Sequence, residues 1–264
     1  MDWMPFAFPA DGLVSIVIPV YNQAHYTKDC LAGVRDLTLE PHEIIVVDNG
    51  SADETPDLLD SYAREGLPLR TIRNDKNLGF TLAANQGMRA AIGDYILLLN
   101  NDVTVTPHWL FGLLRMAQSA DDIGIVGPRI LDPRTGQIKT IGGLVFRKGG
   151  VQAPPGENCP REEPAFTMPL ECQYAEGSCM LIKRAVVDAI GCLDESFAPA
   201  YYEDVDYCFR AREAGFRVVY SPYSEIYHYS TVTAQAVQRE DNEFTRASHR
   251  NDRKFRERWA HRFW

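Results

Sequence analysis

Three polar side chains follow a strongly hydrophobic segment in YILLLNNDV, residues 95–103. The four apolar residues 96–99 are typical of a strand that is buried on both faces, as at the centre of a parallel sheet. Asn100, Asn101 and Asp102 come directly after it. Ligands of open parallel sheets bind beyond the carboxyl ends of the strands. One carboxylate and two amides at this point therefore predict a ligand site.

Two other predicted strands, residues 14–20 and 43–48, also end in polar or aromatic residues. At these ends the sequence has Pro19, Tyr21, Asn22, Asp48 and Asn49. Parallel topology would bring all three strand ends to one edge of the sheet. An aromatic ring, a carboxylate and amides suit a nucleobase and ribose. The alternative for Asp48 and Ser51 is that they cap the helix that follows.

Phosphate binding by a glycine-rich loop is not indicated, because the sequence has neither GxxxxGK nor a GxGxxG after its first strand. A bound diphosphate would then need a cation, and we expect Asp102 to hold Mg²⁺ or Mn²⁺. One carboxylate binds such an ion weakly, so the cation should arrive with the nucleotide.

A second acidic cluster, Glu203, Asp204 and Asp206, begins a predicted helix in YYEDVDYCFRAREAGFRVVY. Acidic residues at a helix N-terminus are favoured by the macrodipole, which is one interpretation. The other is that one carboxylate is a general base directed into the same cleft. His228, in YSEIYHYS after a strand, is a candidate metal ligand or an ordinary hydrogen-bonded polar residue.

The predicted elements alternate between strand and helix in the first half of the chain. We expect strands over 14–20, 43–48, 69–73 and 95–99, and helices over 24–37, from 51–53 to about 64, and over 81–91. This order is typical of βαβ units with a parallel sheet. Later we expect a helix over 107–119, a strand over 123–130 broken by Gly127 and Pro128, a long surface loop over 142–169, and elements over 178–183, 204–214 and 216–220.

Composition limits the class of protein. The chain has 264 residues, 45% of them hydrophobic, a net charge of −9 and a pI near 5.2, which argues against nucleic-acid binding. Six cysteines without a CxxC pair indicate a reduced, cytoplasmic protein. The N-terminus does not resemble a signal peptide, and no apolar run approaches the ~20 residues of a membrane span.

The end of the chain combines aromatic and basic residues. Phe255, Trp259 and Phe263 recur every four residues among several arginines. One hypothesis is a basic amphipathic helix that contacts the inner face of an anionic membrane. The alternative is that the aromatic stripe packs back on the catalytic domain as its closing helix.

Five segments together closely resemble family 2 glycosyltransferases, especially the bacterial rhamnosyltransferase-like branch. They are SIVIPVYNQ, EIIVVDNGSADET, NDKNLGFTLAANQGMRAAIGDYILLLNNDV, YAEGSCMLIKR, and YYEDVDYCFRAREAGFRVVYSP with the later IYH. The resemblance covers residues 14–228. It implies an α/β GT-A fold, in which a mostly parallel central sheet joins a nucleotide-binding half to an acceptor-binding half.

The resemblance also implies roles for single residues. Those matching nucleotide-binding positions are Pro19, Tyr21, Asn22, Asp48, Asn49, Gly79, Asn85 and Asn101. Asp204, with Glu203 beside it, matches the catalytic base of the family's ED pair. Asp102 lies in the family's metal motif, and His228 matches a late metal ligand. Asn100 stands where many members have Asp, which leaves Asp102 as the principal ligand.

From this resemblance we expect one domain over 1–264, with a nucleotide-sugar half (14–103), an acceptor half (104–230) and a helical tail (231–264). The expected activity is inverting transfer of a sugar from a UDP- or dTDP-linked donor to a hydroxyl of a cell-surface glycan or lipid-linked acceptor. A runner-up, a sugar-1-phosphate nucleotidyltransferase, would need a basic glycine-rich loop that YNQAHY lacks. A non-enzyme alternative is a catalytically weakened partner protein that binds nucleotide sugars.

Overall fold

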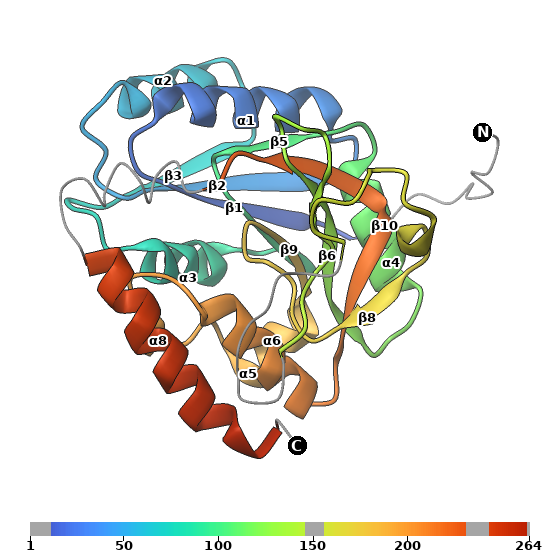
Figure 1. Cartoon of the computed structure of the whole chain (residues 1–264). Helices are drawn as coiled ribbons and strands as arrows, with labels where there is room; N and C mark the ends of the chain where they lie inside the picture. Colours follow the sequence, from blue (N-terminus) through green and yellow to red (C-terminus); the bar gives the residue numbers. More distant parts are fainter. Residues whose placement is uncertain (1–11, 146–155, 231–242, 263–264) are drawn as a thin grey trace.

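The computed structural model describes residues 12–145, 156–230 and 243–262. Within these residues one mixed sheet of ten strands forms the centre of the molecule, and helices cover both of its faces (Figure 1). The main path of the sheet has the order β3-β2-β1-β4-β9-β6-β10-β5, with β7 beside β6 and β8 beside β10.

The first half contains four parallel strands and three helices. These are β1 (Val14–Val20), α1 (Ala24–Leu37), β2 (His42–Asp48), α2 (Thr55–Arg64), β3 (Leu69–Arg73), α3 (Phe80–Ala90) and β4 (Tyr95–Leu99). All neighbouring pairs among these strands are parallel. The predicted βαβ half is therefore confirmed. Wherever the prediction gave a definite boundary, the observed boundary differs from it by at most one residue.

The second half adds strands of both directions. They are β5 (Val103–Val105), β6 (Ile123–Leu131), β7 (Ile138–Thr140), β8 (Leu170–Cys172), β9 (Cys179–Lys183) and β10 (Arg217–His228). β9 enters the centre of the sheet antiparallel to both β4 and β6. Because β9 runs against β4, its first residue lies at the edge where β4 ends. This geometry brings residues 176–178 beside Asn100.

Two strand predictions in this half were wrong. β6 continues through Gly127 and Pro128, and β10 extends eight residues beyond its predicted end at Tyr220. The pairing of β10 with β6 shifts register between Ser221 and Glu225, opposite Pro128. Such an irregularity accommodates a proline, which has no N–H for the ladder. His228 is consequently the last residue of the strand.

The helices form two layers with separate hydrophobic clusters. One cluster contains Leu31 of α1, Leu59 of α2 and Leu113 of α4 (Trp109–Gln118). The other lies across the sheet and contains residues of α3 and α6 (Glu203–Glu213), beside α5 (Arg184–Ile190). Short 3₁₀ helices occur at Pro164–Phe166, Glu195–Phe197 and Ala260–Arg262. Of the predicted 142–169 loop, residues 146–155 lie outside the described part.

The tail forms helix α8 (Glu243–Trp259), which packs below α3 and beside α6 in Figure 1. Phe255 and Trp259 are only 0% and 3% exposed and belong to the second cluster. Phe255 and Trp259 therefore pack back on the domain, as the closing-helix alternative predicts. The third aromatic residue, Phe263, lies outside the described residues. Among the described helices, none combines the length and hydropathy needed to cross a membrane.

Candidate active site

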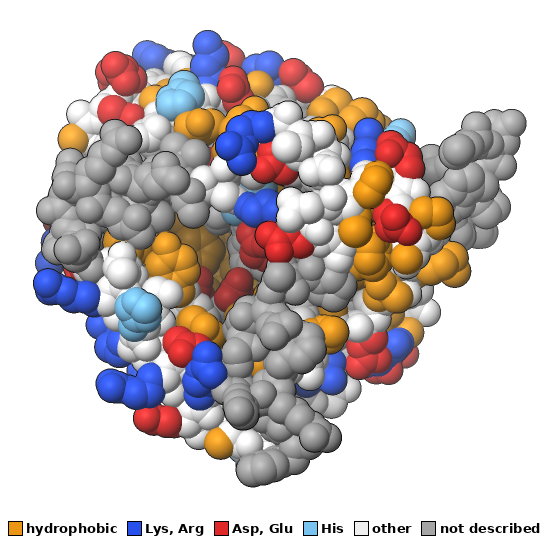
Figure 2. All heavy atoms as spheres, in the orientation of Figure 1, with side chains coloured by type: hydrophobic (Ala, Val, Ile, Leu, Met, Phe, Trp, Pro, Cys, Tyr) orange, Lys and Arg blue, Asp and Glu red, His pale blue; other side chains and the backbone are white. Residues whose placement is uncertain are grey.

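A cavity of about 360 Å³ opens at the edge where β1, β2 and β4 end, and Figure 2 shows it as a hollow containing hydrophobic and acidic side chains. Predicted site residues that line it are Pro19, Tyr21, Asn49, Gly79, Asn101, Asp102, Glu203, Asp204 and His228. The two acidic clusters, a hundred residues apart in the sequence, thus share one cavity.

Three predicted nucleotide-binding residues do not line this cavity. The side chain of Asn22 accepts a hydrogen bond from the Ala52 N–H at 2.8 Å. Asp48 Oδ1 accepts one from the Ser51 N–H at 2.9 Å. Asn85 is completely buried, and its amide bonds the main-chain O and N of Leu193 at 2.9 and 3.0 Å. The structure uses these side chains to join neighbouring segments of the protein.

Asn49 shapes the loop that leads into α3. Its Oδ1 accepts hydrogen bonds from the Leu78 N–H and from Asn74 Nδ2, both at 3.0 Å. The loop ends at Gly79, whose φ is +86° and where an added Cβ would lie 2.4 Å from Cβ of Pro199. Glycine is therefore required at position 79, where the loop meets Pro199 in the segment before α6.

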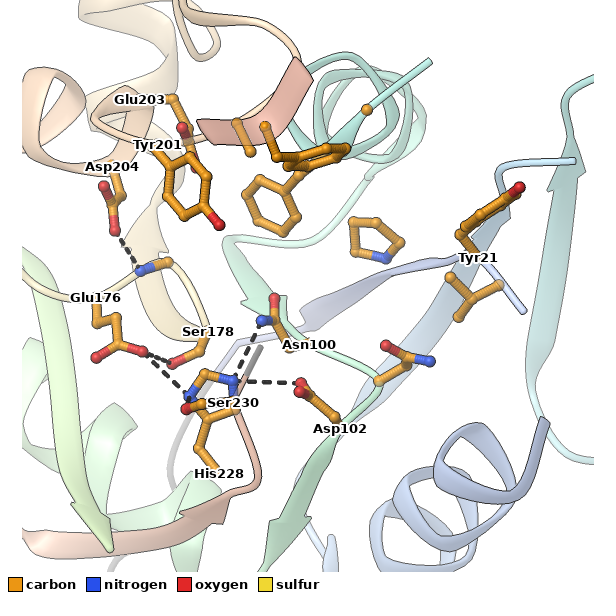
Figure 3. A pocket seen from close by; sticks show the side chains of 18 of the residues that line it. Tyr21, Asn100, Asp102, Glu176, Ser178, Tyr201, Glu203, Asp204, His228 and Ser230 are labelled. Carbon is orange, nitrogen blue, oxygen red and sulfur yellow. Dashed lines mark hydrogen bonds and ion pairs between the residues drawn. The ribbon is translucent and has the colours of Figure 1, made fainter. Parts of the chain in front are cut away.

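Asp102 and His228 face each other across the cavity floor (Figure 3). His228 pairs with Val103 in the antiparallel β5–β10 ladder, which places it next to Asp102. Asp102 Oδ1 and His228 Nε2 are 3.2 Å apart, and both side chains are 6% exposed. The amide nitrogen of Asn100 lies 3.4 Å from the same ring nitrogen. Two segments 126 residues apart thus form one polar cluster.

Glu176 binds the other nitrogen of the same imidazole. Its Oε1 lies 3.1 Å from His228 Nδ1 and accepts a hydrogen bond from Ser178 Oγ at 3.0 Å. Burial alone would lower the pKa of His228, but its hydrogen bonds to Asp102 and Glu176 raise that pKa to about 9. Burial alone would raise the pKa of Glu176, but the contact with His228 lowers it to about 2. The imidazole is therefore held between two carboxylates.

Asp102 and His228 could supply two ligands to a divalent cation whose other ligands come from a bound substrate and water. No group of three or more His, Cys, Asp or Glu side chains among the described residues is arranged to hold a metal. With Glu176 accepting the Nδ1 proton, His228 directs Nε2 toward Asp102, and a cation bound there would displace the proton that a pKa of about 9 keeps on Nε2. Phosphate and water oxygens would have to complete such a site.

The carboxylates at the start of α6 lie on the opposite side of the cavity. Asp204 accepts hydrogen bonds from the N–H groups of Gly177 and Val205, at 2.9 and 2.8 Å. Burial nevertheless raises its pKa to about 6. Glu203 is 6% exposed, and its Oε2 has no hydrogen-bond partner among the described residues. Burial and the charge of Asp204 raise its pKa far above the ordinary value. Two carboxyl groups with raised pKa values therefore lie side by side.

Asp206, the third acid of the cluster, has a different role. It is completely buried and forms ion pairs with Arg210 at 3.0 Å and Arg258 at 2.8 Å. It also accepts a hydrogen bond from the Trp259 indole N–H at 2.9 Å. These contacts join α6 to α8, so this acid stabilises the packing of the two helices.

Several lining residues were missed by the sequence reasoning. They include Lys139, Glu176, Ser178, Tyr201 and Phe244. The signal for Glu176 was present in YAEGSCMLIKR, which was assigned no role in the site. The prediction considered only the carboxyl ends of parallel strands, whereas Glu176 precedes the first residue of an antiparallel one.

The mixed sheet, with its cavity at the ends of the parallel strands, corresponds to the GT-A fold of solved glycosyltransferases. A solved mannosyltransferase, PcManGT from Pyrobaculum calidifontis, has the same fold, with a TM-score of 0.63 and 16% identity over 84% of this chain and 58% of that one. The family model "Glycosyl transferase family 2" matches residues 15–191, and "Glycosyltransferase like family 2" matches residues 162–248. The chain therefore belongs to glycosyltransferase family 2.

Curated relatives agree with this assignment. An N-acetylglucosaminyl-diphospho-decaprenol L-rhamnosyltransferase of Mycobacterium tuberculosis is 28% identical over 82% of this chain and 76% of its own length. This similarity supports the rhamnosyltransferase-like resemblance. The "Uncharacterized protein y4gI" of Sinorhizobium fredii is 28% identical over 87% of this chain. The chain spans only 26% of that relative, and other curated relatives are matched over 32% and 38% of their lengths.

Proposed function

We propose that this protein is an inverting glycosyltransferase. It would move a hexosyl or deoxyhexosyl group from a UDP- or dTDP-linked donor to a hydroxyl of a cell-surface glycan or lipid-linked acceptor, with Mg²⁺ or Mn²⁺ as cofactor. The observation that carries the proposal is the shared cavity, with Asp102 and His228 on one side and Asp204 on the other. Donor activation and proton removal need two such groups in one site.

On the donor side, the strand ends and the loop fixed by Asn49 would receive the nucleoside. Tyr21 lies at the end of β1, apart from the acidic clusters, where its ring can pack against a base (Figure 3). Asp102 and His228 Nε2 would hold the divalent cation. That cation, when bound, stabilises the negative charge of the departing diphosphate.

On the acceptor side, Asp204 would remove the proton from the attacking hydroxyl. Its pKa of about 6 keeps it deprotonated at neutral pH and still basic enough to accept a proton. The N–H groups of Gly177 and Val205 orient the carboxylate. Burial raises the pKa of Glu203, which favours its protonated form and so hydrogen-bond donation over proton abstraction. Attack from the side opposite the leaving group inverts the anomeric carbon.

The relatives support a nucleotide-sugar donor and a lipid-linked acceptor in general, not a particular nucleotide. The Pyrobaculum enzyme was solved with GDP-Man and Mn²⁺, and the name of the mycobacterial relative describes a lipid diphosphate acceptor. We extend the proposal to reversible contact with an anionic membrane surface at its cytoplasmic face. With Phe255 and Trp259 buried, such contact would depend on exposed basic groups such as Arg253, whose side chain is 75% exposed. Salt-sensitive sedimentation with anionic liposomes tests this extension.

A thermal-shift panel of nucleoside diphosphate sugars, each with Mg²⁺ or Mn²⁺, tests the main proposal. A donor at one hundred times its Kd should stabilise the native state by about 2.7 kcal/mol, which is readily measured. The stabilising donor is then incubated with candidate acceptors, and the anomeric configuration of the product is determined by NMR. Absence of stabilisation by every sugar nucleotide, or retention of configuration, contradicts the proposal.

A further inference from the structure

The turn formed by residues 196–202 leads directly into the two acidic residues of the site. It ends at Tyr201 and Tyr202, whose φ angles are +77° and +71°. Residues with a Cβ adopt such angles at a cost and keep them only where the surrounding structure fixes them. Since Glu203 and Asp204 follow at once, the conformation of the 196–202 turn determines where their carboxylates lie.

One buried amide of α8 binds this turn at three places. Asn251 is completely buried. Its Nδ2 lies 2.7, 2.9 and 3.0 Å from the carbonyl oxygens of Phe197, Ala200 and Tyr201. A single NH₂ group thus fixes the backbone on both sides of Pro199, immediately before the strained pair of tyrosines.

Two neighbours of Asn251 on α8 bind carbonyl groups that the amide does not reach. Arg250 Nη2 donates to the Ala198 carbonyl at 2.6 Å, and Lys254 Nζ donates to the Ser196 carbonyl at 2.8 Å. Together the three α8 side chains hold five of the six carbonyls from residue 196 to residue 201. These hydrogen bonds fix the backbone that precedes and includes the two tyrosines and so can hold their unfavourable φ angles.

The tyrosine closest to the acidic pair is also fixed by α8. The Tyr202 hydroxyl donates a hydrogen bond to Asp252 Oδ1 at 2.6 Å, and its ring centre lies 5.5 Å from that of Phe255. Tyr201, on the cavity side in Figure 3, meets Phe244 edge-on at 6.3 Å between ring centres. Phe244 itself lines the cavity, so α8 also forms part of its wall.

We propose that α8 is a positioning element of the active site and that Asn251 is its central positioning residue. Without these donors the turn would relax toward negative φ. The Asp204 carboxylate would then move away from the Gly177 N–H, which it now meets at 2.9 Å. Donor binding should be much less affected, because the ends of β1, β2 and β4 make none of these contacts and only the loop at Gly79 meets the turn, at Pro199. The role in catalysis rests on the proposed function; the effect on the turn does not.

The test compares Asn251→Asp, which keeps the size but replaces the amide donors, with the wild-type chain. Misplacing a catalytic group by about 1 Å can cost about 100-fold, so we expect kcat to fall by about that factor. Donor KM and the calorimetric Kd for nucleoside diphosphate with Mn²⁺ should stay within about twofold. Amide hydrogen exchange should accelerate over residues 196–204 and remain unchanged in β1 and β2.

Two matched controls separate positioning from general stability. Ser221→Ala removes another completely buried side-chain contact, to the Gly112 carbonyl at 2.8 Å, on the distant part of β10. Glu257→Gln changes an exposed α8 residue whose ion pair with Arg253 is 4.0 Å long. Neither control should alter kcat or exchange in the turn. Tyr202→Phe, which removes only the hydroxyl contact to Asp252, should show the same pattern as Asn251→Asp with a smaller loss.

The proposal is overturned if Asn251→Asp and Tyr202→Phe lose activity only in proportion to the unfolded fraction, as a purely structural role predicts. It is also overturned if their donor affinity falls together with kcat. Should Asn251→Asp not fold, Tyr202→Phe decides through the same measurements. If the wild-type protein transfers no sugar, the proposed function fails, while hydrogen exchange still shows whether α8 fixes the turn.

Discussion

The two sides of the cavity are built in different ways. On the donor side, residues near the strand ends are fixed by their immediate structural neighbours, as Asn49 is by Asn74 and Leu78. On the acceptor side, a strained turn is held by a helix 50 residues further along the chain. The two sets of contacts meet only where the loop at Gly79 packs against Pro199. Substitutions should therefore be able to impair the proposed catalytic step with little effect on donor binding, and donor binding without moving the Asp204 carboxylate.

The largest expected effect comes from Asp204→Asn. We expect kcat to fall by about 10²–10⁴-fold, since the amide cannot accept the proton of the acceptor hydroxyl. Affinity for the nucleoside diphosphate, measured by calorimetry, should remain nearly unchanged. Glu203→Gln is the matched control, and its effect should be smaller because the raised pKa of Glu203 favours its uncharged form, which glutamine resembles. If Asp204→Asn keeps more than about a tenth of kcat and Glu203→Gln does not, Glu203 is the base.

Substitutions at Asp102 and His228 should affect the donor side instead. Asp102→Ala and His228→Ala should both weaken metal-dependent binding of nucleoside diphosphate, Asp102→Ala more severely, because Mg²⁺ prefers carboxylate ligands. Imidazole favours softer ions, so His228→Ala should impair binding with Mn²⁺ more than with Mg²⁺. Calorimetric titration with each metal measures both effects. Equal losses with the two metals would show that His228 is not a ligand.

A smaller effect is expected at Glu176, which contacts the ring nitrogen of His228 that faces away from Asp102. Loss of such an orienting partner typically costs 10–100-fold in metal affinity, and we expect Glu176→Ala to fall within about that range. Glu176→Gln, which can still accept the Nδ1 proton, should restore part of the affinity. Mn²⁺ titration at constant nucleotide concentration checks both variants. Unchanged affinity in Glu176→Ala would mean that His228 needs no second carboxylate.

The dependence of activity on pH is the mildest test. With a pKa of about 6, Asp204 loses its function as a base below that pH. The value of kcat/KM should therefore fall about tenfold per pH unit below 6 and level off above it. Glu203→Gln should retain a midpoint near this value, and a midpoint that disappears in this variant would assign the titration to Glu203.

The raised pKa of Asp204 also affects the stability of the fold. The pKa of Asp204 in the folded state, about 6, lies above the ordinary 3.8, so the protonated side chain stabilises the native state at low pH. This contribution is lost as the pH rises through about 6. At neutral pH, Asp204→Asn should therefore melt no lower than the wild-type protein, which also shows that its loss of activity is not a loss of folding.

The sequence was informative where the pattern is local. The apolar runs of β1, β2 and β4 predicted buried parallel strands, and the polar residues that follow them line one side of the cavity. The acceptor side was harder. β9 reverses direction, β10 passes through a bulge, and Glu176 precedes a strand, so none of these follows from the βαβ pattern. Asn22 and Asn85 do not line the cavity and instead form hydrogen bonds between segments, and the motifs that contain them gave no sign of these contacts.

The distance along the chain between the 196–202 turn and Asn251 also orders events during synthesis. At about 5–20 residues per second, a ribosome needs several seconds to make the 50 residues that separate them. During that time the strands β1 to β4 are complete, while β10 and His228 are still being made. The turn, in contrast, lacks the donors that hold its two tyrosines until α8 has been made. A nascent chain of this protein should therefore form the wall of the cavity at the ends of β1, β2 and β4 before the turn that leads into Glu203 and Asp204 is fixed.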